Sequence, residues 1–144
     1  MKSELKPGLT HTQTYETTAQ MRATQLTADV FSTPAMIGLM EGTCVRLTAP
    51  YLDEGENTVG MHVDVYHLAP TKIGQSVTVT AEIIEIAGNK IRYAVSAVND
   101  SGVKIGEGTH RRAVVRAALC ERKGFDESVI EAVRRLKFNK PQRR

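Results

Sequence analysis

Apolar residues recur with a helical period in one segment of the chain and with a strand period in several others. The segment TPAMIGLMEGTC, residues 33–44, is an almost uninterrupted apolar run that contains a single carboxylate, Glu41. Thr33 followed by proline predicts the start of a helix, because threonine is a favoured N-cap and proline is tolerated at the first helical position. Pro50 predicts an end near Ala49. A helix that is apolar on most sides is expected to be wrapped by other structure.

Alternation of apolar and polar residues predicts strands before and after this helix. The threonine-rich stretch 9–18 predicts the first strand, and the less regular stretch 19–32 indicates a loop or short helical turn. Four further strands are predicted within the segments 57–69, 75–89, 91–100 and 103–116. Because short Gly, Pro, Asn and Asp turns separate these segments, consecutive strands are expected to pair in an antiparallel meander.

The strand within residues 57–69 has the most regular pattern. Its expected core face carries four apolar residues, Val59, Met61, Val63 and Val65. In the same register His67 lies on that core face and points toward the layer of the helix. Gly60 interrupts the strand, which indicates a close approach of another backbone or of a ligand.

The order of elements predicts an α+β hotdog fold, in which an antiparallel sheet wraps around a long central helix. Residues 126–138 have helical spacing and predict a C-terminal helix. We expect a single domain over 1–144, with a core at 1–125 and the C-terminal helix and basic tail at 126–144. One protomer would leave a sheet edge uncovered, so a dimer is expected.

Length and composition are those of one soluble domain. The chain has 144 residues, of which 41% are apolar and 24% charged, and its apolar runs are shorter than the roughly 20 residues of a bilayer span. The start lacks the apolar region of a signal peptide, which predicts a cytoplasmic protein without a membrane partner. Two cysteines without a CxxC pattern argue against a zinc site, and Cys44 is expected to be a small core residue.

Positive charge is concentrated at the end of the chain. The formal net charge is +3, and residues 134–144 hold six of the nineteen Lys and Arg residues and no acid. Such a tail attracts phosphates, although a solvated helix end is the commoner arrangement. The aromatic residues of a stacking surface are lacking, apart from Phe138, so nucleic acid is not expected as a partner.

Three polar residues are expected in the layer between helix and sheet. A buried Glu41 needs a hydrogen-bond donor, a cavity or water, and His67 on the facing strand is a natural donor. With the hydroxyl of Thr33, these groups form a hydrolytic constellation. Each also has an ordinary alternative: Thr33 as a cap only, Glu41 reaching solvent and His67 as a satisfied core residue. Arg112 is predicted to face inward with His110 if Val114 does, or to pair with surface acids.

The quoted residues resemble a known family. The segment TPAMIGLMEGTCVRLTAPYLDEGENTVGMHVDVYHLAPTKIGQSVTVTAE and the later GEGTHRRAVV resemble the fluoroacetyl-CoA thioesterase family of hotdog proteins, over roughly residues 30–116. The motif is a threonine eight residues before the glutamate of GLME, a glycine in the next strand, and HxAP at the end of that strand. The resemblance implies hydrolysis of a small acyl-CoA by a homodimer, or a higher oligomer, with sites at the subunit interface and without metal or cofactor.

The resemblance also implies roles for individual residues. Thr33, Glu41 and His67 correspond to the catalytic residues, and Gly60 and Arg112 correspond to substrate-binding residues. In this family pattern Glu41 attacks the thioester carbonyl or activates water, and the two routes stay open. Thr33 hydrogen-bonds the carboxylate or the reacting oxygen, and His67 polarises the thioester or protonates the departing thiolate.

One segment departs from the family pattern. The fluoroacetyl enzyme has an aromatic-rich lid before its catalytic threonine, whereas the stretch MRATQLTADVFS here has Phe31 as its single aromatic residue. This difference predicts a different small acyl-CoA, or an acyl group on another thiol carrier, as the substrate. A non-catalytic protein that binds an acyl-CoA or a related ligand is the alternative function.

Overall fold

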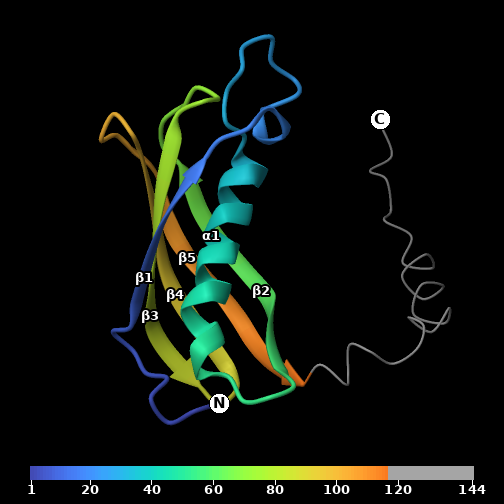
Figure 1. Cartoon of the computed structure of the whole chain (residues 1–144), viewed down its shortest axis with the longest axis vertical. Coiled ribbons are helices and arrows are strands. Elements are labelled where there is room, and N and C mark those ends of the chain that lie inside the picture. Colours follow the sequence, from blue (N-terminus) through green and yellow to red (C-terminus); the bar gives the residue numbers. More distant parts are fainter. Residues whose placement is uncertain (117–144) are drawn as a thin grey trace, which may run out of the picture.

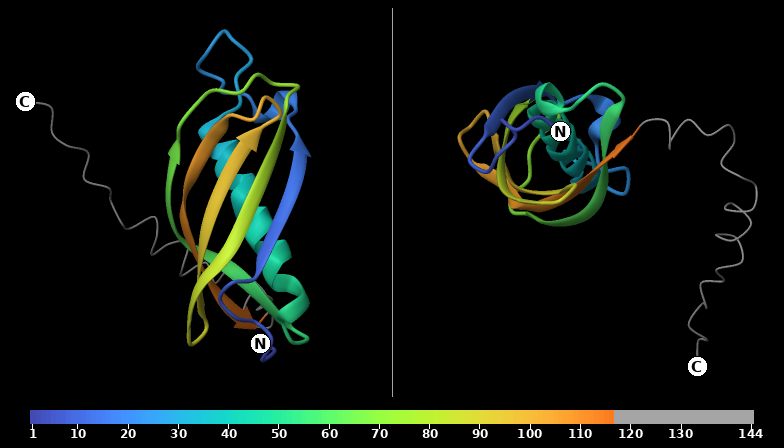
Figure 2. Two further views of the ribbon diagram at one scale, coloured as in Figure 1. Left: turned by 90° about the vertical axis from the view of Figure 1, so that its left-hand side faces the viewer. Right: turned by 90° about the horizontal axis from the view of Figure 1, so that it is seen from below.

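The computed structural model describes residues 1–116, so the predicted C-terminal helix and basic tail at 126–144 lie outside the described residues. One helix, α1 (Thr33–Thr48), lies along a curved antiparallel sheet of five strands (Figure 1). The strands are β1 (Thr10–Glu16), β2 (Glu56–His67), β3 (Ser76–Ala87), β4 (Lys90–Asn99) and β5 (Lys104–Arg116). Seen from below, the sheet curls around the helix, which confirms the predicted architecture (Figure 2).

The strands follow the order β1-β3-β4-β5-β2 across the sheet. β3, β4 and β5 form a meander as predicted, but β2 is not part of it: β2 pairs with β5 instead of β3, because the connection at 68–75 is longer than a hairpin turn. The turn between β3 and β4 is a two-residue hairpin with Gly88 at φ +61°. A glycine with positive φ at the first turn position gives a turn whose twist matches the right-handed twist of the paired strands. α1 connects the two outermost strands, so within the described residues β1 and β2 are both edges of the sheet.

The start of α1 differs in one respect from the prediction. Ser32, rather than Thr33, is the N-cap, and its Oγ accepts a hydrogen bond of 3.2 Å from the backbone N–H of Ala35. Thr33 is the first helical residue, so its hydroxyl is available to a partner elsewhere. The helix ends at Thr48, and Ala49–Tyr51 continue as a short 3₁₀ turn, close to the predicted end.

One side of α1 is packed into the concave face of the sheet. Its fully or almost fully buried apolar side chains lie one helical turn apart: Met36, Met40, Cys44 and Leu47. They meet alternate residues of β3 and β4, among them the buried Tyr93, whose hydroxyl lies 2.5 Å from that of Thr48. On the opposite side of the helix Pro34 and Gly38 are exposed, so this side is not covered by the sheet within the protomer.

β2 contains a bulge that changes which residues face the helix. Its pairing with β5 shifts between Gly60 and His62, so that Met61 is the extra residue of β2. An inserted residue reverses the alternation of faces. Before the bulge Thr58 is buried, and beyond it Val65 packs against the core.

The predicted core face of this strand is therefore wrong for Val59 and Met61, whereas Val63, beyond the bulge, shares the inner side with Val65 and His67. Val59, Met61 and Val63 are 42%, 51% and 39% exposed in the protomer. Val65 is the one that packs against the core, and His67 lies on the same inner side, as predicted. These exposed apolar side chains lie on an unpaired edge strand, and folded proteins normally cover such a feature.

Candidate active site

Two groups of polar side chains lie along α1, and the first is at its N-terminus. The Oγ1 of Thr33 and the Nδ1 of His67 are 2.8 Å apart and joined by a hydrogen bond. Phe31 packs edge-on against the imidazole, with 6.3 Å between the ring centroids. Burial lowers the pKa of His67, so the imidazole is neutral at neutral pH. Its Nε2 is buried and has no hydrogen-bond partner among the described residues.

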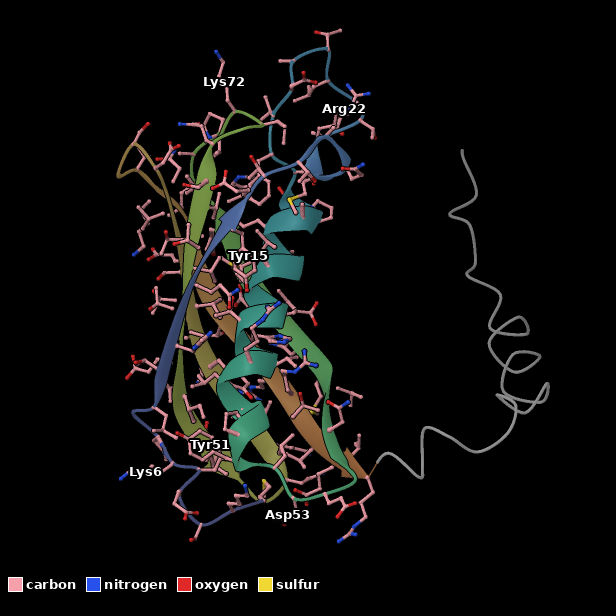
Figure 3. The ribbon with its side chains drawn as sticks, in the orientation of Figure 1. Lys6, Tyr15, Arg22, Tyr51, Asp53 and Lys72 are labelled. Carbon is pink, nitrogen blue, oxygen red and sulfur yellow. The ribbon has the colours of Figure 1, made fainter. Side chains whose placement is uncertain are left out.

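A hollow of about 690 Å³ opens beside this pair. Its walls come from residues 22–26, 30–34 and 67–70, at the end of the molecule where Arg22 is labelled in Figure 3. The volume is in the range of small-molecule sites. Phe31, the aromatic residue of the predicted lid segment, is buried in the wall of this hollow, next to His67.

The second group lies at the middle of α1 and is centred on Arg112 of β5. Its Nη1 donates to the Oε2 of Glu41 at 3.1 Å. Its Nε and Nη2 donate to the side-chain and backbone oxygens of Thr58, each at 2.9 Å. Arg112 is buried, whereas the side chain of Glu41 is 40% exposed and faces a hollow of about 340 Å³. The guanidinium therefore holds a carboxylate that solvent or a ligand can still reach.

His110 completes this second group. Its Nδ1 donates to the backbone oxygen of His62 at 2.7 Å, and its Nε2 accepts from the Nη1 of Arg112 at 3.1 Å. These roles require the neutral imidazole with its proton on Nδ1, because a guanidinium only donates. Burial is the main cause that lowers the pKa of His110 and favours this neutral form. The ring also stacks on Tyr93, at 6.2 Å between centroids.

Gly60 provides the space for the carboxylate, as its place in the strand predicts. A Cβ at this position would lie 2.9 Å from the Oε2 of Glu41, 3.4 Å from His110 and 3.5 Å from Arg112. The first of these distances is shorter than side chains tolerate. Glycine is therefore the residue that lets β2 approach the group around Arg112.

The structure brings together some of the predicted site residues and separates others. Thr33 and His67 are in contact, but Glu41 follows Thr33 by eight residues, or about 12 Å along the helix axis. The predicted hydrogen bond between His67 and Glu41 is not formed within the protomer, where Arg112 is the donor to Glu41. The inward orientation of Arg112 and His110 is confirmed.

Sequence reasoning gave no role to His110 and did not find Thr58. Thr58 lies two residues before Gly60, and so it shares the face of the glycine that approaches the helix. Reading the strand outward from Gly60 instead of from its valines would have placed Thr58 inside. His110 lies two residues before Arg112 and was placed on its face by the same alternation.

The part of the chain that the structure describes shows neither a reactive cysteine nor a cluster of metal ligands. Cys44 is buried and burial raises its pKa to about 12, in agreement with a core residue rather than a nucleophile. Among residues 1–116, no three His, Cys, Asp or Glu side chains gather in a way that would hold a metal ion. No helix of this part is long and apolar enough to cross a bilayer.

An antiparallel sheet curled around one long helix is the hotdog fold. The hot-dog-like protein from Thermanaerovibrio acidaminovorans has a TM-score of 0.73 and 25% identity, over 88% of this chain and 91% of that one. Within this class the chain belongs to the fluoroacetyl-CoA-specific thioesterase family, FlK, whose family model matches residues 13–118.

Individual members of the family are similar over different lengths. The fluoroacetyl-CoA thioesterase of Streptantibioticus cattleyicolor is 48% identical over 87 residues, which are 60% of this chain and 62% of that protein. The chain thus aligns with less than two thirds of that relative. A mutant of the fluoroacetyl-CoA-specific thioesterase FlK, in complex with fluoroacetate and CoA, has a TM-score of 0.75 at 35% identity, over 81% of this chain and 99% of that one.

Proposed function

We propose that this protein is a thioesterase that hydrolyses a small acyl-CoA to the free acid and CoA. The observation that carries the proposal is Glu41, a carboxylate that faces a hollow and is fixed by a buried arginine. Membership of the fluoroacetyl-CoA-specific thioesterase family supports this activity, as do the relatives named as thioesterases.

The chemistry follows from the groups that face the two hollows. Glu41 either attacks the thioester carbonyl, forming an anhydride that water then opens, or takes a proton from a water that attacks directly. Both routes break the C–S bond, give a hydroxyl to the acyl carbon and leave a proton to the departing sulfur. His67 polarises the carbonyl or delivers that proton, and Thr33 orients the imidazole through the hydrogen bond at Nδ1.

The acyl group is proposed to be small and different from fluoroacetyl. The hollow beside Thr33 is bounded by Thr24, Gln25 and Leu26, where the fluoroacetyl enzyme is expected to carry its aromatic lid. Aromatic rings over the site are the groups expected to exclude water and to select fluorine, and these three residues supply none. We therefore propose as the substrate another short acyl-CoA, or an acyl group on another thiol carrier.

We propose further that the working site is formed by two copies of the chain. Glu41 and His67 lie apart in one protomer, and the edge strand β2 exposes apolar Val59, Met61 and Val63. If two β2 strands pair antiparallel about a two-fold axis at Asp64, with Met61 the extra residue as it is against β5, Gly60 of one copy is opposite His67 of the other. Glu41, which touches Gly60, then lies beside the second copy's imidazole.

The unpaired nitrogen of His67 supports this arrangement. Its buried Nε2 has no hydrogen-bond partner among the described residues, and buried polar atoms are normally satisfied. A turn of the imidazole that brings Nε2 to the interface would let a carboxylate or bound thioester at the second copy satisfy it. Size-exclusion chromatography with light scattering at micromolar concentration is expected to give a dimer, and a monomer would contradict the proposal. The expected cytoplasmic location stays part of the proposal, supported by the free, buried Cys44.

A panel of acyl-CoA esters from acetyl to octanoyl, assayed by thiol release, tests the activity. Wild-type protein is expected to turn over the shorter esters, and Glu41→Ala is expected to lose thiol release while it keeps its circular dichroism spectrum. Binding of the esters without any thiol release would favour the non-catalytic alternative. No turnover of any member of the panel would contradict the proposed function.

A further inference from the structure

His110 lies between the buried arginine of the site and the edge strand β2, and the proposed chemistry gives it no part. Its Nδ1 donates to the backbone oxygen of His62 at 2.7 Å, and its Nε2 accepts from the Nη1 of Arg112 at 3.1 Å. The side chain is 2% exposed, yet it lines the hollow that Glu41 faces. A proton from solvent therefore has a route to this imidazole.

The acceptor at Nε2 determines where the hydrogens of Arg112 point. The Nε and Nη2 of the guanidinium are held by Thr58, each at 2.9 Å. The two hydrogens of Nη1 lie in the plane of the guanidinium, so one is directed at the Oε2 of Glu41 and the other at the Nε2 of His110, both at 3.1 Å. Because the neutral imidazole holds one hydrogen of Nη1, the other stays directed at the carboxylate.

A proton on Nε2 reverses this contact. An imidazolium donates at both nitrogens, so it can no longer accept from Arg112, and it places a second positive charge beside Nη1. The Oε2 of Glu41 lies 3.7 Å from Nε2 and is available to the new N–H after a small movement. The carboxylate is then shared between two cations, and less of its charge is available to attack a carbonyl or to take a proton from water.

The ionisable groups that face His110 come from four elements. They are Glu41 of α1, His62 of β2, Tyr93 of β4 and Arg112 of β5. Burial is the main cause that lowers the pKa of His110, and Arg112 acts in the same direction, against Glu41. The hydroxyl of Tyr93 stays protonated, because burial raises its pKa to about 12. The imidazole is therefore neutral at neutral pH, and the carboxylate of Glu41 is the group that responds when it is protonated.

We propose that neutral His110 is a positioning residue for the hydrolysis, which directs Arg112 at Glu41, and that a proton on its Nε2 withdraws the carboxylate from the thioester. Solvent supplies this proton and takes it back when the pH rises, so the step needs no other reactant. Activity in acid is then limited by a residue that acts through Arg112. This inference rests on the proposed function.

The dependence of kcat on pH tests this role. In wild-type protein, kcat for a short acyl-CoA is expected to fall about tenfold for each pH unit below the pKa of His110. His110→Gln keeps an acceptor for Arg112 but does not titrate, so its kcat is expected to stay near the neutral value through the first such unit. His11→Gln, a histidine of β1, is the matched control and is expected to keep the wild-type profile. Circular dichroism at each pH confirms that the proteins stay folded.

Two kinetic results overturn the proposal. One is a fall of kcat at the same pH in His110→Gln as in wild type, which assigns the fall to another group such as His67. The other is a loss by the same factor at every pH, which shows a structural role only.

NMR of the carboxylate separates this proposal from the proposed function. The carboxyl carbon of Glu41, assigned by comparison with Glu41→Gln, is followed as the pH is lowered, together with the imidazole of His110. The carboxyl resonance is expected to shift when His110 titrates, and this shift is expected to be lost in His110→Gln. Such a shift in a protein that hydrolyses no acyl-CoA supports the positioning role, and only the proposed function fails. A carboxyl resonance that does not respond to His110 overturns the positioning role, whatever the activity.

Discussion

The Nη1 of Arg112 lies 3.1 Å from the Oε2 of Glu41 and connects β5 to the middle of α1. Nε and Nη2 of this guanidinium donate to Thr58, and Nη1 also donates to His110. Because these partners lie on rigid strands, the carboxylate is held in one place before any substrate arrives. Such preorganisation is what a nucleophile or general base requires.

Replacement of the guanidinium fork by a single ammonium tests this positioning. Arg112→Lys keeps the charge but cannot serve Glu41, Thr58 and His110 together, so kcat is expected to fall about 10²-fold. Arg46→Lys is the control, since Arg46 is exposed and donates to Tyr15 on the β1 side of the helix. Steady-state kinetics and thermal unfolding of both variants measure the effect. Equal kcat values for the two variants would show that the fork does not position Glu41.

A side chain at Gly60 is expected to displace the carboxylate of Glu41. The added methyl group of Gly60→Ala meets the Oε2 of Glu41 at 2.9 Å, so the carboxylate must move and kcat is expected to fall by one to two orders of magnitude, about 10–10². Gly38→Ala is the matched control, because nothing lies within 4 Å of its Cβ and alanine favours the helix by about 0.5–1 kcal/mol. Thiol release and thermal unfolding distinguish the two. Full activity of Gly60→Ala would contradict the assigned role.

The hydroxyl of Thr33 is expected to act through His67. Thr33→Val keeps the shape of the side chain but loses the hydrogen bond to Nδ1, so kcat is expected to fall about tenfold or more. Thr33→Ser keeps the hydroxyl and is expected to retain most of the activity. Since Ser32 caps the helix, neither change is expected to alter thermal unfolding by more than a few degrees. A matching loss in the serine and valine variants would argue against the hydrogen bond as the cause.

His67 and His110 predict a pH dependence of stability. Burial lowers the folded-state pKa of His67 and of His110 below their ordinary value of 6.5. The unfolded chain therefore binds more protons as the pH falls below 6.5, and the free energy of unfolding decreases until the pH passes the folded-state pKa values. Above 6.5 their contribution is constant.

His110→Gln provides the comparison, because its amide oxygen can still accept from Arg112 but does not titrate. Urea unfolding at pH 8, 6.5 and 5 is expected to show a smaller decrease for this variant than for wild type. Identical pH profiles of the two proteins would mean that His110 is not a source of the acid sensitivity.

Much of the fold is accessible from the sequence because its signals are local. The proline after Thr33 and the apolar run that follows define the helix, and the turn residues between alternating segments define the meander. The faces of β2 are not accessible in this way. A bulge at Met61 depends on how the strand pairs with β5, and it takes Val59 and Met61 off the predicted core face.

The candidate site is predictable in its residues more than in its contacts. Glu41 stands out as a carboxylate in an apolar helix, and Arg112 follows from the alternation of β5. Glu41 and Arg112 are joined by a hydrogen bond, and His110 is hydrogen-bonded to both Arg112 and His62. These contacts depend on where each strand crosses the helix in three dimensions. The separation of Glu41 from His67 depends on three-dimensional geometry that strand periodicity does not encode.

Mixing two inactive variants tests the two-copy active site most directly. Glu41→Gln and His67→Ala are expected to be inactive alone, because each removes one group from every site. After the two are mixed and allowed to exchange subunits, half of the dimers are mixed and each contains one intact site, so thiol release from a short acyl-CoA is expected to reach about a quarter of the wild-type rate. Sites formed within one protomer would give no recovery, and that result would contradict the account.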